Sequence, residues 1–158
     1  MTDETTFLTP AAFRKLTEEL EQLTTEGREE IEERIAEARS HGDLKENAEY
    51  DAAKNAQGMM EARIRQVTHL LENAEVRKVE DTGRVEVGSV VTVIDADGDE
   101  VEYLVAPKEN KVPGIALASP TSPLGEALLG ASVDDDVSFD APAGTFTVRV
   151  VSVRPFED

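Results

Sequence analysis

The stretch HGDLKENAEY, residues 41–50, separates two long charged segments of the chain. Its Gly42 interrupts a helical pattern that contains no proline between Pro10 and Ala74. Glycine loses more conformational freedom in a helix than any other residue, so this position favours a turn. Three carboxylates and a tyrosine lie within the same ten residues. The chemistry of this turn therefore bears directly on function.

The segments on either side of the turn carry apolar or small residues with helical spacing, and the two sets match. Paired in antiparallel order, the residue numbers of every pair add to 87, and both sets change to a spacing of four at the same level. Large residues also face small ones, as packed helices require. A shared seam of this kind predicts an antiparallel coiled-coil hairpin rather than two unrelated surface helices. The first set is Phe13, Leu16, Leu20, Leu23, Gly27, Ile31 and Ile35, and the second is Ala52, Ala56, Met60, Ile64, Val67, Leu71 and Ala74.

The matching sets place the centre of the hairpin between Asp43 and Leu44. An arm that covers residues 13–40 has a length of about 42 Å at 1.5 Å per residue. Its distal end carries no other apolar surface to bury, so we expect the hairpin to project from the rest of the molecule.

The second half of the chain has the short alternating runs of β-branched residues that are typical of strands. Residues 89–94 and 100–106 flank an Asp-Gly turn, and residues 136–153 supply two more strands. Ser122 as a cap and Pro123 at the first helical position predict a short helix that ends at Gly130. The expected class is α+β. The expected ranges are 1–76 for the hairpin, with its acidic tip at 41–50, 77–84 for a linker and 85–158 for a globular domain.

Composition limits the classes of partner. The 158 residues include 16 Lys and Arg against 34 Asp and Glu, giving a net charge of −18. This charge opposes non-specific binding to duplex DNA, which depends on cations that contact phosphate, and it favours a basic partner surface. No cysteine is present, so disulfides and thiolate metal sites are excluded. Without a signal peptide or a long apolar run, we expect a soluble cytoplasmic protein that does not bind membranes.

Asp43 and Glu46 in the turn have two readings. As a capping box, Asp43 is the N-cap of the second helix and Glu46 is its third residue, and both satisfy free amide donors. Physical chemistry alone favours this structural reading. In the functional reading the same two carboxylates converge on one Mg²⁺, which takes few protein carboxylates and completes its coordination with water and phosphate oxygens. Such a site is incomplete, so any chemistry must complete a site that belongs to another molecule.

The segment ARSHGDLKENAEYDAAK, residues 38–54, resembles the tip of the Gre transcript-cleavage factors of bacterial RNA polymerase, and more closely the GreA type. Its acidic positions match together with Asn47, Glu49 and Tyr50. The resemblance covers nearly the whole chain. Further matching segments are LTPAAFRKLTEEL (8–20), EARIRQVTHLLENAEV (61–76) and SPTSPLGEALLGASVDDDVSF (119–139).

The resemblance implies a fold and a mode of action. The C-terminal half is then an FKBP-like domain of antiparallel strands with a short helix, and it docks at the rim of the polymerase secondary channel. The hairpin passes down this channel to the catalytic Mg²⁺ and to the extruded 3′ end of nascent RNA. Asp43 and Glu46 help to hold a second Mg²⁺ that is shared with the polymerase active site, and the free protein binds none stably. The protein is then no autonomous enzyme, and we expect a monomer.

Several further residues carry two interpretations. Tyr50 stacks on an extruded base, or it packs along the hairpin. Asn47, Glu49 and Lys45 position the tip or contact polymerase or RNA. A docking contact and a core helix are both compatible with the segment Ser122, Pro123, Leu124 and Gly125. Six basic residues attract RNA phosphate or, as we slightly favour, form interhelical salt bridges. These six are Arg34, Arg39, Lys45, Lys54, Arg63 and Arg65.

Three functions follow from these readings. The first is a transcription elongation factor that stimulates Mg²⁺-dependent hydrolysis of backtracked RNA. The second is a Gre-fold regulator that occupies the channel and inhibits the polymerase without stimulating cleavage. The third is a structural coiled-coil adaptor with no chemistry. The tip retains the pattern of the cleavage factors, which favours the first.

Overall fold

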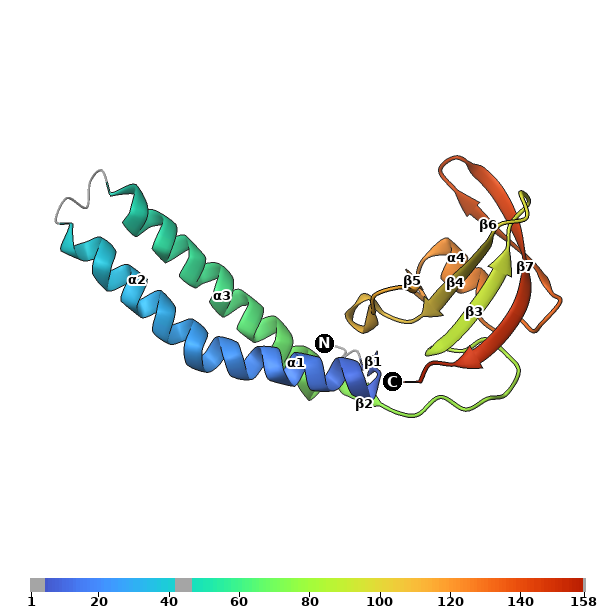
Figure 1. Cartoon of the computed structure of the whole chain (residues 1–158), viewed down its shortest axis with the longest axis horizontal. Helices are drawn as coiled ribbons and strands as arrows, with labels where there is room; N and C mark the ends of the chain where they lie inside the picture. The colour runs from blue at the N-terminus through green and yellow to red at the C-terminus, as the bar shows by residue number, and fades with distance from the viewer. Residues whose placement is uncertain (1–4, 42–46, 158) are drawn as a thin grey trace. The chain divides into compact units, whose positions relative to one another are not determined.

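The computed structural model describes residues 5–41 and 47–157, and these form two compact units. One unit is helical and spans Phe13–Asn73, and the other combines the segment that ends at Ala12 with the chain from Ala74 onward. The predicted α+β class is confirmed, because the first unit is a helical hairpin and the second is built on a curled sheet (Figure 1).

The helices are α1 (Pro10–Gln22), α2 (Arg28–Ser40), α3 (Ala48–Glu72) and α4 (Pro123–Leu128), with a π-helical turn at Leu23–Gly27 and a 3₁₀ turn at Lys108–Asn110. The strands are β1 (Thr6–Leu8), β2 (Ala74–Val76), β3 (Ser89–Ile94), β4 (Glu100–Val105), β5 (Ala116–Ala118), β6 (Asp136–Ala141) and β7 (Gly144–Pro155). No helix in the described ranges is long and apolar enough to cross a bilayer.

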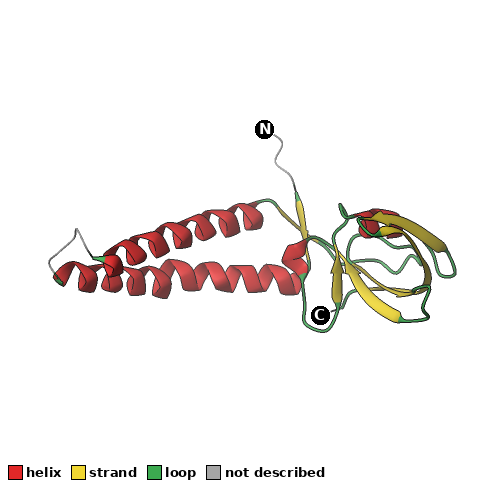
Figure 2. Cartoon of the chain, turned by 90° about the horizontal axis from the view of Figure 1, so that it is seen from above, coloured by secondary structure: helices red, strands yellow, loops and turns green. Residues whose placement is uncertain are grey.

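The helical unit is an antiparallel hairpin in which α3 returns along α2 and α1 (Figure 2). Leu16, Ile31 and Ile35 of the first predicted set are buried, as are Ile64 and Val67 of the second. In the first arm, the unbroken run of seam positions that are spaced four residues apart begins at the π-helical turn Leu23–Gly27. A π-helical turn inserts one extra residue, so this arm keeps its seam facing the partner.

The predicted seam is wrong at one end. Ala52 is exposed, whereas Ala53 is fully buried against Ile31 and Ile35. The reason is geometric, because a spacing of four residues turns an α-helix about 40° past a full turn. Since α3 is a continuous α-helix with no π-helical turn, the run of fours that ends at Ala52 rotates off the seam.

Two ion pairs join the arms beside the apolar seam. Arg28 donates to Glu61 at 3.0 and 3.1 Å, and Arg63 donates to both carboxylate oxygens of Glu19 at 2.7–3.2 Å. The hydrogen bond from Arg28 lowers the pKa of the Glu61 carboxyl below its usual value of 4.5. The folded hairpin therefore favours the ionised form of Glu61.

The other unit contains a five-stranded sheet in the order β5-β4-β3-β7-β6. The predicted hairpin strands are confirmed as β3 and β4, and the two later strands as β6 and β7. The sheet is mixed rather than wholly antiparallel, because β5 pairs with β4 in parallel. So short a strand, of three residues, gives no alternating pattern that the sequence could have revealed.

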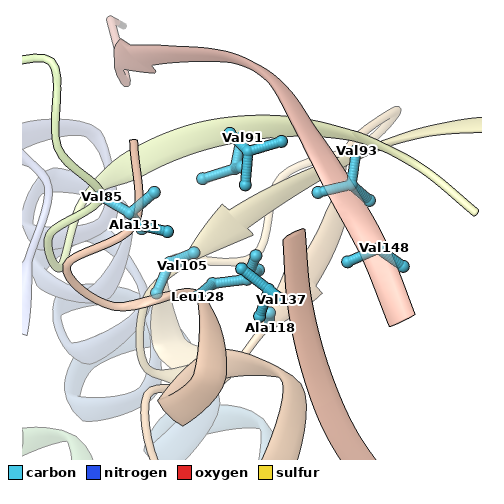
Figure 3. Close-up of a cluster of buried hydrophobic side chains, with 10 residues drawn as sticks. Val85, Val91, Val93, Val105, Ala118, Leu128, Ala131, Val137 and Val148 are labelled. Atoms are coloured by element: carbon cyan, nitrogen blue, oxygen red, sulfur yellow. The ribbon is translucent and has the colours of Figure 1, made fainter. Parts of the chain in front are cut away.

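Both faces of this sheet are buried at β3, since Val90 and Val91 are adjacent in this strand, point to opposite sides and are both buried. Leu128 of α4 lies in the cluster on the Val91 face (Figure 3). Phe7 and Val79 lie in the cluster on the Val90 face. This second cluster therefore includes residues from outside 85–158, the range predicted for the globular domain.

The boundaries of the units thus differ from the expected ranges 1–76, 77–84 and 85–158. β1 pairs in parallel with β2, and Val79, in the expected linker, is buried in the sheet unit. The side chain of Asn110, only 1% exposed, accepts from the Thr9 amide at 2.8 Å and donates to the Phe7 carbonyl at 2.9 Å. The segment before the first helix is therefore fastened to the sheet unit by hydrogen bonds that connect residues about a hundred positions apart.

Gly27→Leu tests the seam. A Cβ atom at Gly27 would lie 3.2 Å from the Met60 sulfur, so we expect leucine to overpack the seam and lower the free energy of unfolding by about 1–3 kcal/mol. A Cβ atom at Gly58, on the same hairpin, would meet nothing within 4 Å, so Gly58→Leu should stabilise instead, by up to about 1 kcal/mol. Urea denaturation measures both, and equal effects of the two substitutions would contradict the seam.

Asn110→Ala should lower the free energy of unfolding of the sheet unit by about 1–3 kcal/mol, because the Phe7 carbonyl and the Thr9 amide lose their partner in a buried place. Asn55→Ala, at an exposed position of α3, should change it by less than about 0.5 kcal/mol. Chemical denaturation measures both free energies of unfolding. If Asn110→Ala loses no more than Asn55→Ala, these hydrogen bonds contribute little to stability.

Glu61→Gln should lower the melting temperature of the hairpin near pH 7. The lowered pKa means that this stabilisation is present above pH 4.5, the usual pKa of the group, and is lost as the pH falls through the folded-state pKa. The difference between wild type and Glu61→Gln should therefore disappear in acid. Glu33→Gln, at an exposed position of α2 more than one helical turn from Arg28, removes the same charge away from the Arg28–Glu61 pair, and calorimetry should find a smaller difference at pH 7.

Candidate functional site

The predicted catalytic and metal-binding residues, Asp43 and Glu46, lie outside the described residues, as does Lys45. The structure does describe the two helix ends that border them. Helix α2 ends at Ser40, with His41 as its C-cap, and α3 begins at Ala48, with Asn47 as its N-cap. The candidate site is therefore the tip of the hairpin, and its described part consists of these two ends.

Asn47 joins the two ends with one side chain. Its carboxamide oxygen accepts from the Tyr50 amide of α3 at 2.9 Å, and its carboxamide nitrogen donates to the Ala38 carbonyl in the last turn of α2. The Asn47 backbone carbonyl accepts from the Asp51 amide at 3.2 Å. With Asn47 only 9% exposed and Ala38 buried beneath it, this is the best-protected polar contact among the described residues of the tip.

The position of the N-cap corrects the capping-box reading, in which Asp43 was the N-cap of the second helix. Asparagine and aspartate are about equally good N-caps, so the sequence contained two candidates four residues apart. The match to the capping-box pattern selected the first one. The local pattern could not show that Asn47 also contacts Ala38, because that contact depends on how the two helix ends approach each other.

Tyr50 is held within the hairpin. Its ring packs against the cluster of Ile31, Ile35 and Ala53, and the Arg39 guanidinium lies 5.8 Å from the ring centroid. These contacts match the reading in which Tyr50 packs along the helices. Cation–π contacts at exposed sites contribute about 0.5–1 kcal/mol, so Arg39 adds modestly to the order of the tip.

Glu49 lies in the first turn of α3 and is 72% exposed, with a carboxylate oxygen 3.5 Å from the His41 ring nitrogen Nδ1. Glu49 and Asp51 place negative charge where the helix dipole favours it. An open concavity of about 470 Å³ beside this turn is lined by Arg34, Glu37, Ala38, Ala48, Glu49 and Ala52.

The basic residues of the hairpin divide between the two predicted roles. Arg63 pairs with Glu19 across the two arms, which is the predicted interhelical salt bridge. Lys54 donates to the Gln57 side chain at 3.0 Å on its own helix, and Arg34 lines the tip concavity. Arg65 is exposed. The salt-bridge reading therefore holds for Arg63, whereas Arg34 and Arg65 remain at the surface.

The docking candidates in the sheet unit mostly have structural roles. Ser122 is the N-cap of α4 and accepts from the Gly125 amide at 3.1 Å, and Leu124 packs against the core of the sheet. Gly125 is buried, and a Cβ atom there would lie 1.8 Å from the Ser119 carbonyl oxygen, so only glycine fits. Of the four candidates, Pro123 alone is exposed.

Metal ligands are sparse in the part of the chain that the structure describes. It holds no group of three or more histidine, aspartate or glutamate side chains placed to bind a metal ion. The Asn47 carboxamide is already used by both helices. The described residues of the tip therefore do not form a cation site by themselves.

Comparison with known proteins covers both units. A family model described as transcription elongation factor, N-terminal, matches residues 6–76, and one described as transcription elongation factor, GreA/GreB, C-term, matches residues 80–155. The transcription elongation factor GreA of Streptomyces coelicolor is 42% identical over 158 residues, which cover 98% of this chain and 96% of the relative. GreA of Syntrophotalea carbinolica is 42% identical over 149 residues, covering 92% and 94%.

Among solved structures, GreA factor homolog 1 (Gfh1) of Thermus thermophilus aligns with 96% of this chain and 99% of its own, at 30% identity and a TM-score of 0.44. The sequence matches, rather than this superposition, identify the relatives.

Proposed function

Because the chain belongs to the GreA/GreB family of transcription elongation factors, we propose that it enters the secondary channel of bacterial RNA polymerase and stimulates hydrolysis of backtracked nascent RNA. In this proposal it rescues arrested complexes in the cytoplasm as a monomer. The observation that carries the proposal is the coincidence of two features at one place. The acidic turn lies within the family match, and the ends of the two helices that border it are joined by Asn47.

The hairpin delivers the turn to an active centre that belongs to the polymerase. Its apolar seam and cross-arm ion pairs hold the two helices together along the arms, and Asn47 holds their ends. The many carboxylates on the outer surfaces of α1 and α2 suit a basic channel wall. Like charge on the hairpin and on nucleic acid would also discourage binding to duplex DNA elsewhere.

Asp43 and Glu46 would hold one face of a Mg²⁺ ion and leave its other positions to water, RNA phosphate and the polymerase. When bound, this ion would lower the pKa of the attacking water and stabilise the leaving oxygen. The carboxylates themselves orient the water and accept its hydrogen bond. Since two carboxylates alone bind Mg²⁺ weakly, hydrolysis would occur only inside the complex, and the chain would be no enzyme by itself.

The sheet unit would dock on the polymerase at the channel rim. Pro123 is the one member of the predicted docking segment whose side chain is exposed, so the N-terminal end of α4 is the part of this segment that can contact a partner. Ser122 and Gly125 would act indirectly, by fixing the start of α4.

The test is a cleavage assay on purified, stalled bacterial elongation complexes with backtracked RNA. We expect wild type to shorten the RNA in a Mg²⁺-dependent reaction, and Asp43→Asn or Glu46→Gln to reduce the rate by about 100-fold or more, as for the loss of one group that stabilises a transition state. Asp51→Asn removes one charge from the neighbouring helical turn and should retain the rate.

Other results would replace the proposal. Slower elongation without shortened RNA would identify a regulator that blocks the channel. No effect on either cleavage or elongation would indicate a structural coiled-coil adaptor.

A further inference from the structure

We infer that Asn47 positions the two acidic residues of the tip through its carboxamide, and that no other N-cap residue can replace it. This inference rests on the proposed function, since the positions of Asp43 and Glu46 matter only if they act in cleavage. It goes further because it assigns the positioning of the two carboxylates to one residue that, in this proposal, touches neither RNA nor metal.

The hydrogen bond between Asn47 and Ala38 closes a loop in the chain. Asp43 and Glu46 both lie within this loop, and Glu46 is the neighbour of Asn47 in sequence. Helix ends leave amides and carbonyls without partners, and so the last turn of α2 and the first turn of α3 would otherwise fray. The bridge satisfies one group on each helix and fixes both ends of the loop that carries the acids.

The remaining described contacts between the two ends cannot take over this role. His41 and Glu49 are more than half exposed and 3.5 Å apart, so their attraction is screened by water. The contact of Arg39 with the Tyr50 ring is a long one at the surface of the hairpin. The Asn47 bridge is nearly buried, and it links the Ala38 carbonyl to the start of α3, whereas the other hydrogen bond to this carbonyl, from the His41 amide at 3.3 Å, stays within the end of α2.

The requirement is for an amide in particular. Ser, Thr and Asp are good N-caps because each offers an oxygen to a helix amide, here that of Tyr50. An ionised aspartate has no donor, so it would direct an oxygen at the Ala38 carbonyl. A serine hydroxyl is shorter than the carboxamide and carries a single hydrogen. Both residues therefore keep the cap and lose the bridge.

Asn47→Asp and Asn47→Ser separate the cap from the bridge, and they differ from each other in charge. We compare them with Ile64→Val, which loosens the buried seam nearly four helical turns from Tyr50 along α3. Each protein is titrated against backtracked complexes to obtain the half-saturating concentration and the maximal cleavage rate. Amide hydrogen exchange by NMR reports the two helix ends in the free protein.

We expect both Asn47 variants to keep the half-saturating concentration within twofold of wild type, because docking is unchanged. Their maximal rates should fall by about 10- to 100-fold, the effect of misplacing catalytic groups by about an ångström. Ile64→Val should melt earlier and keep its maximal rate. In the variants the Tyr50 amide should stay protected, whereas exchange in the last turn of α2 should become at least tenfold faster.

The inference is overturned if either Asn47 variant retains a maximal rate within twofold of Ile64→Val, or if the end of α2 exchanges as slowly as in wild type. Failure of the proposed function looks different, because wild type itself would then leave the RNA uncut.

Discussion

The carboxamide of Asn47 joins two helix ends, because it donates to the Ala38 carbonyl at the end of α2 and accepts from the Tyr50 amide at the start of α3. A turn between two helices can present side chains reproducibly only if both of its ends are fixed. One buried side chain meets that condition here, and it directly follows Glu46 in the sequence. In the proposed function, the positions of Asp43 and Glu46 depend on this contact.

Along the arms, the hairpin is held by a narrow seam in which small and large residues alternate. The π-helical turn at Leu23–Gly27 adds one residue to the first arm, and Gly27 leaves room there for Met60. The second arm has no such turn and shifts its seam to Ala53. The two arms thus meet along a common line although their residue spacings differ, and the outer surfaces remain free for charge.

Most of the fold follows from local sequence signals. The Asp-Gly turn, the serine cap and the alternating runs identify β3, β4, β6, β7 and α4, since each signal acts over a few residues. The missed features depend on partners far apart in the sequence. The Asn110 side chain binds the Thr9 amide, and β5 pairs with β4 in parallel. Neither contact produces a periodic pattern in the sequence. At the tip, the acids could be named from the motif, whereas the role of Asn47 required knowing which carbonyl lies opposite.

The central claim is that the turn reaches the catalytic centre of a polymerase, where its acids complete a site that this chain alone lacks. The most direct measurement replaces Leu44 with a photo-crosslinking amino acid and maps its products in a backtracked elongation complex. The account predicts crosslinks to the 3′ end of the RNA from this position, and crosslinks to protein only from the same group at Gly58 on the arm. Crosslinks from Leu44 that fall only on the outer surface of the polymerase would contradict it.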